Sequence, residues 1–115
     1  MHTFYYLSSC DTCKRIMKTL QLPSSVHLVD VKKTPLTEED LSLLYSHTGS
    51  YEALLNKRAQ KLKEIDKNKL TEEIIKELLL THYTFLKRPV LLHNNNLFIG
   101  NAASTVEAAK ASLNG

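Results

Sequence analysis

The chain has 115 residues, of which 43% are hydrophobic and 23% are charged, and its formal net charge at pH 7 is +3. These values are typical of a soluble globular protein, and no apolar run approaches the ~18 residues that a membrane-spanning helix requires, so we expect no membrane association. Three glycines are too few for a glycine-rich phosphate loop, which excludes that class of nucleotide site.

The first predicted strand covers residues 2–7 and leads through a Ser8–Ser9 turn to two cysteines, Cys10 and Cys13. Residues 14–20 then carry apolar side chains at helical spacing. Cys10 therefore lies at a helix N-terminus, where unpaired N–H groups and the helix dipole stabilise a thiolate. Cys13 lies one turn further on the same face, close enough to attack a sulfur bonded to Cys10. This arrangement predicts a redox-active dithiol.

Three other interpretations compete with the redox site. A zinc site needs four ligands, and the five histidines are scattered, so we expect no metal. Two buried and unreactive cysteines are the second alternative, because free cysteine often packs as a small hydrophobic residue. A structural disulfide is the third. It is disfavoured because no signal-peptide pattern precedes the first strand, which leads us to expect a reducing, cytoplasmic compartment.

The next part of the chain predicts a second strand and then a helical region. Residues 26–31 alternate in polarity and are rich in valine, which is typical of a strand. From about residue 36 to 86 the pattern is helical. Thr37 and Thr71 are each followed by acidic residues and predict helix N-caps, whereas Gly49 predicts the end of the first of these helices.

The basic residues concentrate between Lys57 and Lys69. The section 57–65 predicts a basic amphipathic helix, and residues 51–55 predict a short helical turn before it. A run of this kind is usually the solvated face of a helix, so we expect no direct binding to nucleic acid.

After the helical region the apolar pattern becomes that of strands. Residues 90–92 and 97–99 are short apolar runs, joined by His93 and three asparagines. Asparagine tolerates the left-handed conformation of tight turns, so the segment predicts a β-hairpin. An alanine-rich helix over 102–113 follows.

The predicted order is strand, helix, strand, helical insert, hairpin and helix. Two strands joined by a crossover helix form a parallel pair, to which the hairpin adds two more strands. We therefore expect an α/β, thioredoxin-like fold: a four-stranded mixed sheet with helices on both faces and an inserted all-helical subdomain at about 36–86. Residues 1–115 form a single domain in this interpretation.

Three sequence blocks point to a family. They are residues 6–14, residues 51–58, and residues 87–90 with Gly100 after the hairpin, and they fall in order across nearly the whole chain. Together they resemble the ArsC/Spx/YffB family of arsenate-reductase-like proteins, which carry a helical insert in a thioredoxin-like fold. The middle block is most similar to the YffB branch, whose members typically have Gly where this chain has Ala59.

The resemblance implies that Cys10 is the nucleophile and that three arginines would hold an oxyanion substrate. Arg88 matches one of these arginines. Alignment on the middle block puts Glu52 at the second position, and the third falls near residues 100–101. A carboxylate repels an arsenate anion, so we expect arsenate to be a poor substrate.

The resemblance also implies that Pro89 is a cis-proline beside the active cysteine. Arg88 would then be a catalytic group that stabilises the Cys10 thiolate or binds an anionic thiol substrate. Pro89, Asn56 and Arg58 are the predicted substrate-binding residues.

These observations predict a thiol–disulfide oxidoreductase that uses Cys10 and Cys13. Its substrate would be a small thiol in disulfide form or a protein disulfide. We expect a monomer with no bound cofactor, reduced by glutathione or by a thioredoxin or glutaredoxin system. One alternative is a redox-sensing regulator like Spx, which binds RNA polymerase. The other is a true arsenate reductase.

Overall fold

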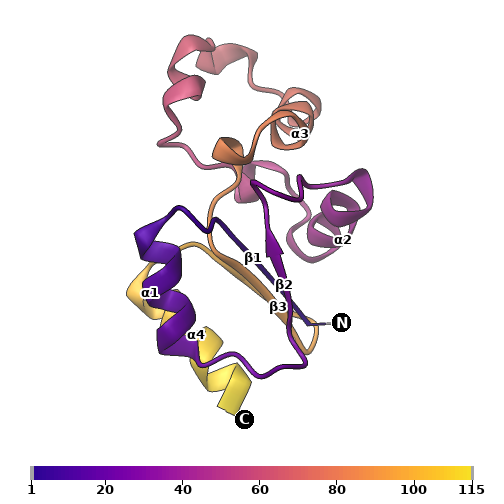
Figure 1. Ribbon diagram of the computed structural model, residues 1–115. Coiled ribbons are helices and arrows are strands. Elements are labelled where there is room, and N and C mark those ends of the chain that lie inside the picture. Colours follow the sequence, from indigo (N-terminus) through magenta and orange to yellow (C-terminus); the bar gives the residue numbers. More distant parts are fainter. Residues whose placement is uncertain (1, 115) are drawn as a thin grey trace. The chain divides into compact units, whose positions relative to one another are not determined.

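The computed structural model describes residues 2–114, and Figure 1 shows its helices and strands along the chain. The chain forms two compact units. One comprises the residues up to Thr34 together with those from Arg88 onward, and the other is Pro35–Lys87. The second unit lies in the part of the chain where the sequence predicts the helical insert. Within residues 2–114, no helix is both long and apolar enough to cross a bilayer.

The first unit contains a four-stranded sheet and two helices. The strands are β1 (Thr3–Tyr6), β2 (His27–Asp30), β3 (Val90–His93) and β4 (Asn96–Ile99), and the helices are α1 (Asp11–Leu20) and α4 (Ala103–Asn114). The strand order is β2-β1-β3-β4; β1 pairs with β2 in parallel, and the other pairs are antiparallel. The predicted fold class, a thioredoxin-like mixed sheet, is confirmed.

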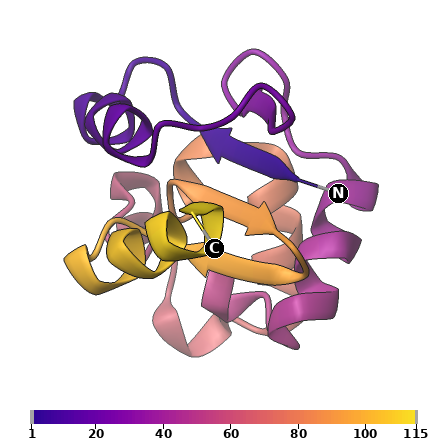
Figure 2. The same ribbon diagram turned by 90° about the horizontal axis from the view of Figure 1, so that it is seen from below.

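The core of this unit lies between one face of the sheet and the two helices. Phe4 of β1 pairs with Leu91 of β3, so both side chains point to the same face of the pleated sheet. Ile16 and Leu20 from α1 and Ala109 from α4 pack against them. Figures 1 and 2 show α1 and α4 on the same side of the sheet. The alternation also sends Tyr5, Val90 and Leu92 to the opposite face, where they are buried as well.

The predicted hairpin between β3 and β4 is confirmed. Its two turn residues, Asn94 and Asn95, have φ values of 50° and 65°. A two-residue turn of this kind needs a left-handed backbone at both positions, and asparagine adopts it at low cost.

The second unit contains two α-helices, α2 (Glu38–Thr48) and α3 (Glu72–Thr81). Both predicted N-caps are confirmed: the Thr37 hydroxyl accepts the N–H of Asp40 at 3.1 Å, and the Thr71 hydroxyl accepts the N–H of Ile74 at 3.3 Å. Gly49 ends α2 with a φ of 67°, as predicted, because a left-handed backbone suits glycine.

Between the two helices, the basic amphipathic helix predicted over 57–65 is present only in part, as a 3-10 helix at Gln60–Glu64. The chain forms only 3-10 helices there, at Glu52–Leu54, Gln60–Glu64 and Lys67–Lys69. Ala59 and Leu62 are buried and Ile65 is half-buried, so the apolar residues recur every three positions, which is the period of a 3-10 helix and not of an α-helix.

The unit is also not all-helical. Leu55 and Leu86 form an isolated antiparallel bridge, and the N–H of Lys87 donates to the carbonyl of Leu54 at 2.8 Å. These bonds join the end of the first 3-10 helix to the residues just before β3. The single-domain boundaries stay a prediction.

Candidate active site

The turn between β1 and α1 presents Cys10. The N–H of Cys10 donates to the carbonyl of Leu7 at 3.0 Å, which closes the turn over Ser8 and Ser9. Cys10 is the N-cap of α1, with an extended backbone (φ −96°, ψ 115°), and its carbonyl accepts the first helical bond from Lys14 at 3.1 Å. The predicted place of Cys10 at the helix N-terminus is confirmed.

The surroundings of Cys10 stabilise its thiolate. Burial tends to raise the pKa of Cys10, but this is outweighed by hydrogen bonds from the Cys13 N–H, the Cys13 thiol and the Thr12 N–H and by the positive charge of Arg88. The pKa of Cys10 is therefore lowered from the ordinary thiol value. The first backbone N–H groups of an α-helix have no acceptor within the helix, so those of α1 can donate to the Cys10 sulfur.

Cys13 has the opposite chemistry. Its side chain is 1% exposed, and burial raises its pKa to about 11. The N–H of Leu7 lowers the pKa of Cys13 and the hydrogen bond and charge of Cys10 raise it, while Arg88 again favours the thiolate. Near neutral pH Cys13 is therefore a protonated thiol whose hydrogen bond stabilises the Cys10 thiolate.

Arg88 and Pro89 reach the same place from β3. Tyr5 of β1 lies opposite Val90, the first residue of β3, so the two residues before Val90 lie beside the end of β1 that leads to Cys10. The Arg88–Pro89 peptide bond is cis, as the resemblance implies, and Pro89 is buried. Cys10, Cys13 and Arg88 thus lie close enough in the first unit for each to affect the charge of the others. Their catalytic roles stay predictions.

Asn56 and Arg58 belong to the second unit. The Asn56 side chain donates to the Thr84 carbonyl at 3.2 Å and accepts the Arg58 N–H at 3.1 Å, so its polar atoms stabilise local structure. Arg58 is exposed. Their roles in substrate binding stay predictions.

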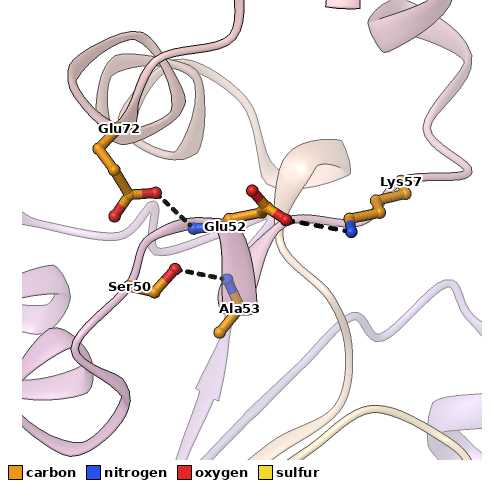
Figure 3. A network of polar contacts seen from close by, with 5 residues as sticks. All are labelled: Ser50, Glu52, Ala53, Lys57 and Glu72. Carbon is orange, nitrogen blue, oxygen red and sulfur yellow. Dashed lines mark hydrogen bonds and ion pairs between the residues drawn. The ribbon is translucent and has the colours of Figure 1, made fainter.

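Glu52 lies in a polar network of the second unit, drawn in Figure 3. Its carboxylate pairs with the Lys57 ammonium at 3.3 Å, and both side chains are exposed. The two oxygens of Glu72 accept the N–H groups of Tyr51 at 2.8 Å and of Glu52 at 3.1 Å. The network attaches the start of α3 to the 3-10 helix at Glu52–Leu54. The place of Glu52 in an anion pocket stays a prediction.

One residue close to the cysteine turn was not predicted from the sequence. Asp30, the last residue of β2, is 9% exposed, and its Oδ1 accepts the N–H of Ser8 at 3.4 Å and the N–H of Lys32 at 3.2 Å. The sequence signal that could have identified Asp30 is a carboxylate at the end of a valine-rich strand. Over the described part of the chain, no three His, Cys, Asp or Glu side chains are grouped closely enough to hold a metal ion.

Two known proteins are similar to this chain in sequence. The regulatory protein MgsR of Bacillus subtilis is 32% identical over 104 residues, covering 85% of this chain and 81% of MgsR. An uncharacterised protein of Haemophilus influenzae is 30% identical over 115 residues, covering 96% of this chain and all of that protein.

Solved structures share the fold. A YffB protein superposes with a TM-score of 0.78 at 23% identity and covers 98% of this chain and 99% of its own. An arsenate reductase (ArsC) related protein from Brucella melitensis has a TM-score of 0.72 at 26% identity and covers 93% of this chain and 92% of its own. The model of the ArsC family matches residues 5–109. This chain belongs to the ArsC family.

Proposed function

We propose that the protein is a thiol–disulfide oxidoreductase in which Cys10 is the nucleophile and Cys13 the resolving thiol. The observation that carries the proposal is the opposite ionisation of the two thiols: the pKa of Cys10 is lowered and that of Cys13 is raised to about 11. A thiolate is the species that attacks a disulfide, so only Cys10 is prepared to react first near neutral pH.

In the first step, the Cys10 thiolate attacks one sulfur of the substrate disulfide. A bond forms between Cys10 and that sulfur, the substrate S–S bond breaks, and the other half leaves as a thiolate. Arg88 supplies positive charge at this site, so it also favours an anionic thiol such as glutathione. In this proposal Pro89 and the second-unit residues Asn56 and Arg58 contribute to substrate binding.

In the second step, Cys13 resolves the mixed disulfide. Once Cys10 is bonded to the substrate, it no longer carries the negative charge that raises the pKa of Cys13. Cys13 loses its proton to solvent and attacks the Cys10 sulfur. The Cys10–Cys13 disulfide forms and the second substrate thiolate leaves, so two electrons pass from the dithiol to the substrate. Glutathione or a thioredoxin or glutaredoxin system then reduces the protein.

Turnover of a small disulfide tests the proposal. Reduced glutathione and glutathione reductase would be supplied with hydroxyethyl disulfide, and NADPH consumption would be followed with and without the protein. We expect activity that Cys10→Ser abolishes and Cys13→Ser lowers. Wild-type activity no higher than that of Cys10→Ser would overturn the proposal, provided that both proteins are folded by circular dichroism.

A redox-sensing regulator is the second candidate. The observation in its favour is the 32% identity to the regulatory protein MgsR. In this role the same Cys10–Cys13 disulfide would switch binding to RNA polymerase. Capture of purified RNA polymerase by the oxidised protein, lost in Cys10→Ser, would support the regulator, and the absence of capture in either redox state would exclude it.

A further inference from the structure

A buried carboxylate connects β2 to the turn that carries Cys10. The Leu7–Cys10 turn and Asp30 are 20 or more residues apart in sequence, and Oδ1 of Asp30 accepts the N–H of Ser8 at 3.4 Å. Asp30 itself is held firmly. Its backbone carbonyl accepts the N–H groups of Lys33 at 3.1 Å and Thr34 at 2.8 Å, and the Tyr6 carbonyl accepts the N–H of the next residue, Val31, at 2.9 Å.

The carboxylate is charged at neutral pH. The hydrogen bond from the Ser8 hydroxyl lowers the pKa of Asp30, burial raises it, and the N–H groups of Lys32 and Ser8 and the charge of Lys33 lower it further. Among the described residues, Oδ2 of Asp30 is buried with no hydrogen-bond partner. Burying a carboxylate with one oxygen unpaired is costly, so its presence under the turn calls for a reason.

We propose that Asp30 is a positioning residue for Cys10: its carboxylate holds the Ser8 end of the Leu7–Cys10 turn and so fixes the Cys10 sulfur against the N–H groups of α1. The inference rests on the proposed function, since it assigns Asp30 to the thiolate that performs the chemistry. Asp30 does not touch the reacting sulfur and acts through Ser8.

Position and charge have opposite effects on Cys10, which makes the inference testable. A negative charge near a thiolate raises the pKa of the thiol, so removal of the Asp30 charge alone would lower the pKa of Cys10. Loss of the turn's anchor would instead move Cys10 away from its N–H donors and raise that pKa. Alanine removes both charge and anchor, whereas asparagine removes the charge and keeps an oxygen that accepts the same N–H groups.

The experiment measures the pH dependence of Cys10 alkylation by iodoacetamide in full-length Cys13→Ser protein, with Asp30 unchanged or replaced. We expect Asp30→Ala, which loses the anchor, to raise the pKa of Cys10 by about one unit, and Asp30→Asn, which loses only the charge, to lower it slightly. Below both pKa values, one unit is a roughly tenfold slower reaction. Asp66→Ala is the matched control, because Asp66 accepts an N–H two residues ahead at 3.0 Å, as Asp30 does, but lies in the second unit.

Ser8 offers a second variant pair that keeps the carboxylate in place. Neither Ser8 nor Ser9 has a positive φ. Proline is common at the second position of a β-turn with this backbone, which is the position of Ser8. Ser8→Pro removes the N–H donor and Ser8→Ala removes only the hydroxyl. We expect Ser8→Pro to raise the pKa of Cys10 and Ser8→Ala to raise it less.

The outcomes separate the two claims. If Cys10 with Asp30 intact titrates at the ordinary thiol pKa, the proposed function fails. If that pKa is lowered but Asp30→Asn and Asp30→Ala lower it further by equal amounts, Asp30 acts only as a charge and the positioning role is overturned. The positioning role is also overturned if the pKa of Cys10 is unchanged in both Asp30→Asn and Ser8→Pro, provided that both proteins are folded by circular dichroism. This holds whether Asp30→Ala leaves that pKa unchanged or fails to fold.

Discussion

Cys10 and Cys13 lie one helical turn apart at the start of α1, and their thiols ionise in opposite directions. Cys10 faces the N–H groups at the helix N-terminus and its pKa is lowered, whereas burial raises the pKa of Cys13 to about 11. The same short segment therefore provides a thiolate and the thiol that donates a hydrogen bond to it. Which cysteine reacts first follows from this difference.

The first prediction concerns alkylation of single-cysteine proteins. Cys10 alone, in Cys13→Ser, should react with iodoacetamide well below the ordinary thiol pKa because the helix N–H groups and Arg88 stabilise its thiolate. Cys13 alone, in Cys10→Ser, should react slowly throughout the neutral range because it is buried. Rates measured from about pH 6 upward test this. A faster reaction of Cys13 at about pH 6 would reverse the assignment.

The second prediction concerns Arg88. Arg88→Ala should raise the pKa of Cys10 and slow the formation of a mixed disulfide, because a positive charge beside the thiolate is lost. Arg88→Lys should restore only part of the rate, since an ammonium lacks the planar guanidinium. Stopped-flow measurement with oxidised glutathione gives the rates.

Lys87→Ala is the control for Arg88, because it removes the neighbouring exposed positive charge. It should leave the pKa of Cys10 and the rate nearly unchanged. If both alanine variants have the same small effect, Arg88 contributes only to the general surface charge.

The third prediction concerns arsenate. We expect weak arsenate reduction, because losing one anion-binding donor commonly slows a reaction by roughly 10²–10³ and two of the three expected arginines are missing. Arsenite formation would be measured with glutathione and glutaredoxin. Glu52→Arg should increase it, and Glu52→Gln, which removes the repulsive charge without adding a donor, should increase it less. Efficient turnover by the wild-type protein would contradict this prediction.

The fourth prediction concerns stability at mildly acidic pH. His93 is buried, its Nδ1 lies 2.8 Å from the Ser112 hydroxyl, and burial followed by the nearby His2 charge lowers its pKa. The unfolded chain therefore binds a proton at this residue before the folded chain does. As pH falls through about 6.5, the ordinary histidine pKa, the free energy of unfolding should decrease.

Urea denaturation at about pH 7.5 and about pH 5.5 measures this decrease. His93→Gln should make the difference between the two pH values smaller. Asp30 does not contribute here: its folded pKa is lowered, so its carboxylate is charged in both states over this range. An equal pH dependence in the wild-type and His93→Gln proteins would exclude His93 as its source.

The fifth prediction compares two leucines that flank the same residue. Leu91 and Leu28 pair with Phe4 from opposite sides, but Leu91 is 2% exposed and Leu28 is 47% exposed. Leu91→Ala should lower the free energy of unfolding by about 2–5 kcal/mol, as removal of a buried leucine does, and Leu28→Ala by roughly 1 kcal/mol or less. Equal losses in urea denaturation would contradict the described core.

Local sequence signals predicted much of the fold. Thr37, Gly49 and the asparagines of the hairpin have a conformational or capping preference that acts within a few residues, and each does what its residue type predicts. Cys10 is similar, since a turn followed by an apolar helical pattern is enough to place it at a helix N-terminus.

Features that depend on distant contacts or on small differences of period could not be predicted. The 3-10 helix at Gln60–Glu64 differs from an α-helix by a period of three instead of 3.6, and a short apolar pattern does not separate them. The hydrogen bond between Asp30 and Ser8 joins residues 22 positions apart, and it exists because β1 and β2 are parallel and end side by side.

The central claim is tested most directly by trapping the mixed disulfide. Wild-type, Cys13→Ser and Cys10→Ser proteins would be treated with oxidised glutathione and analysed by intact-protein mass spectrometry. We predict a glutathione adduct on Cys10 that accumulates in Cys13→Ser, an internal disulfide without an adduct in the wild type, and no adduct in Cys10→Ser. An adduct on Cys13 in Cys10→Ser, with none on Cys10 in Cys13→Ser, would contradict the assignment of nucleophile and resolving thiol.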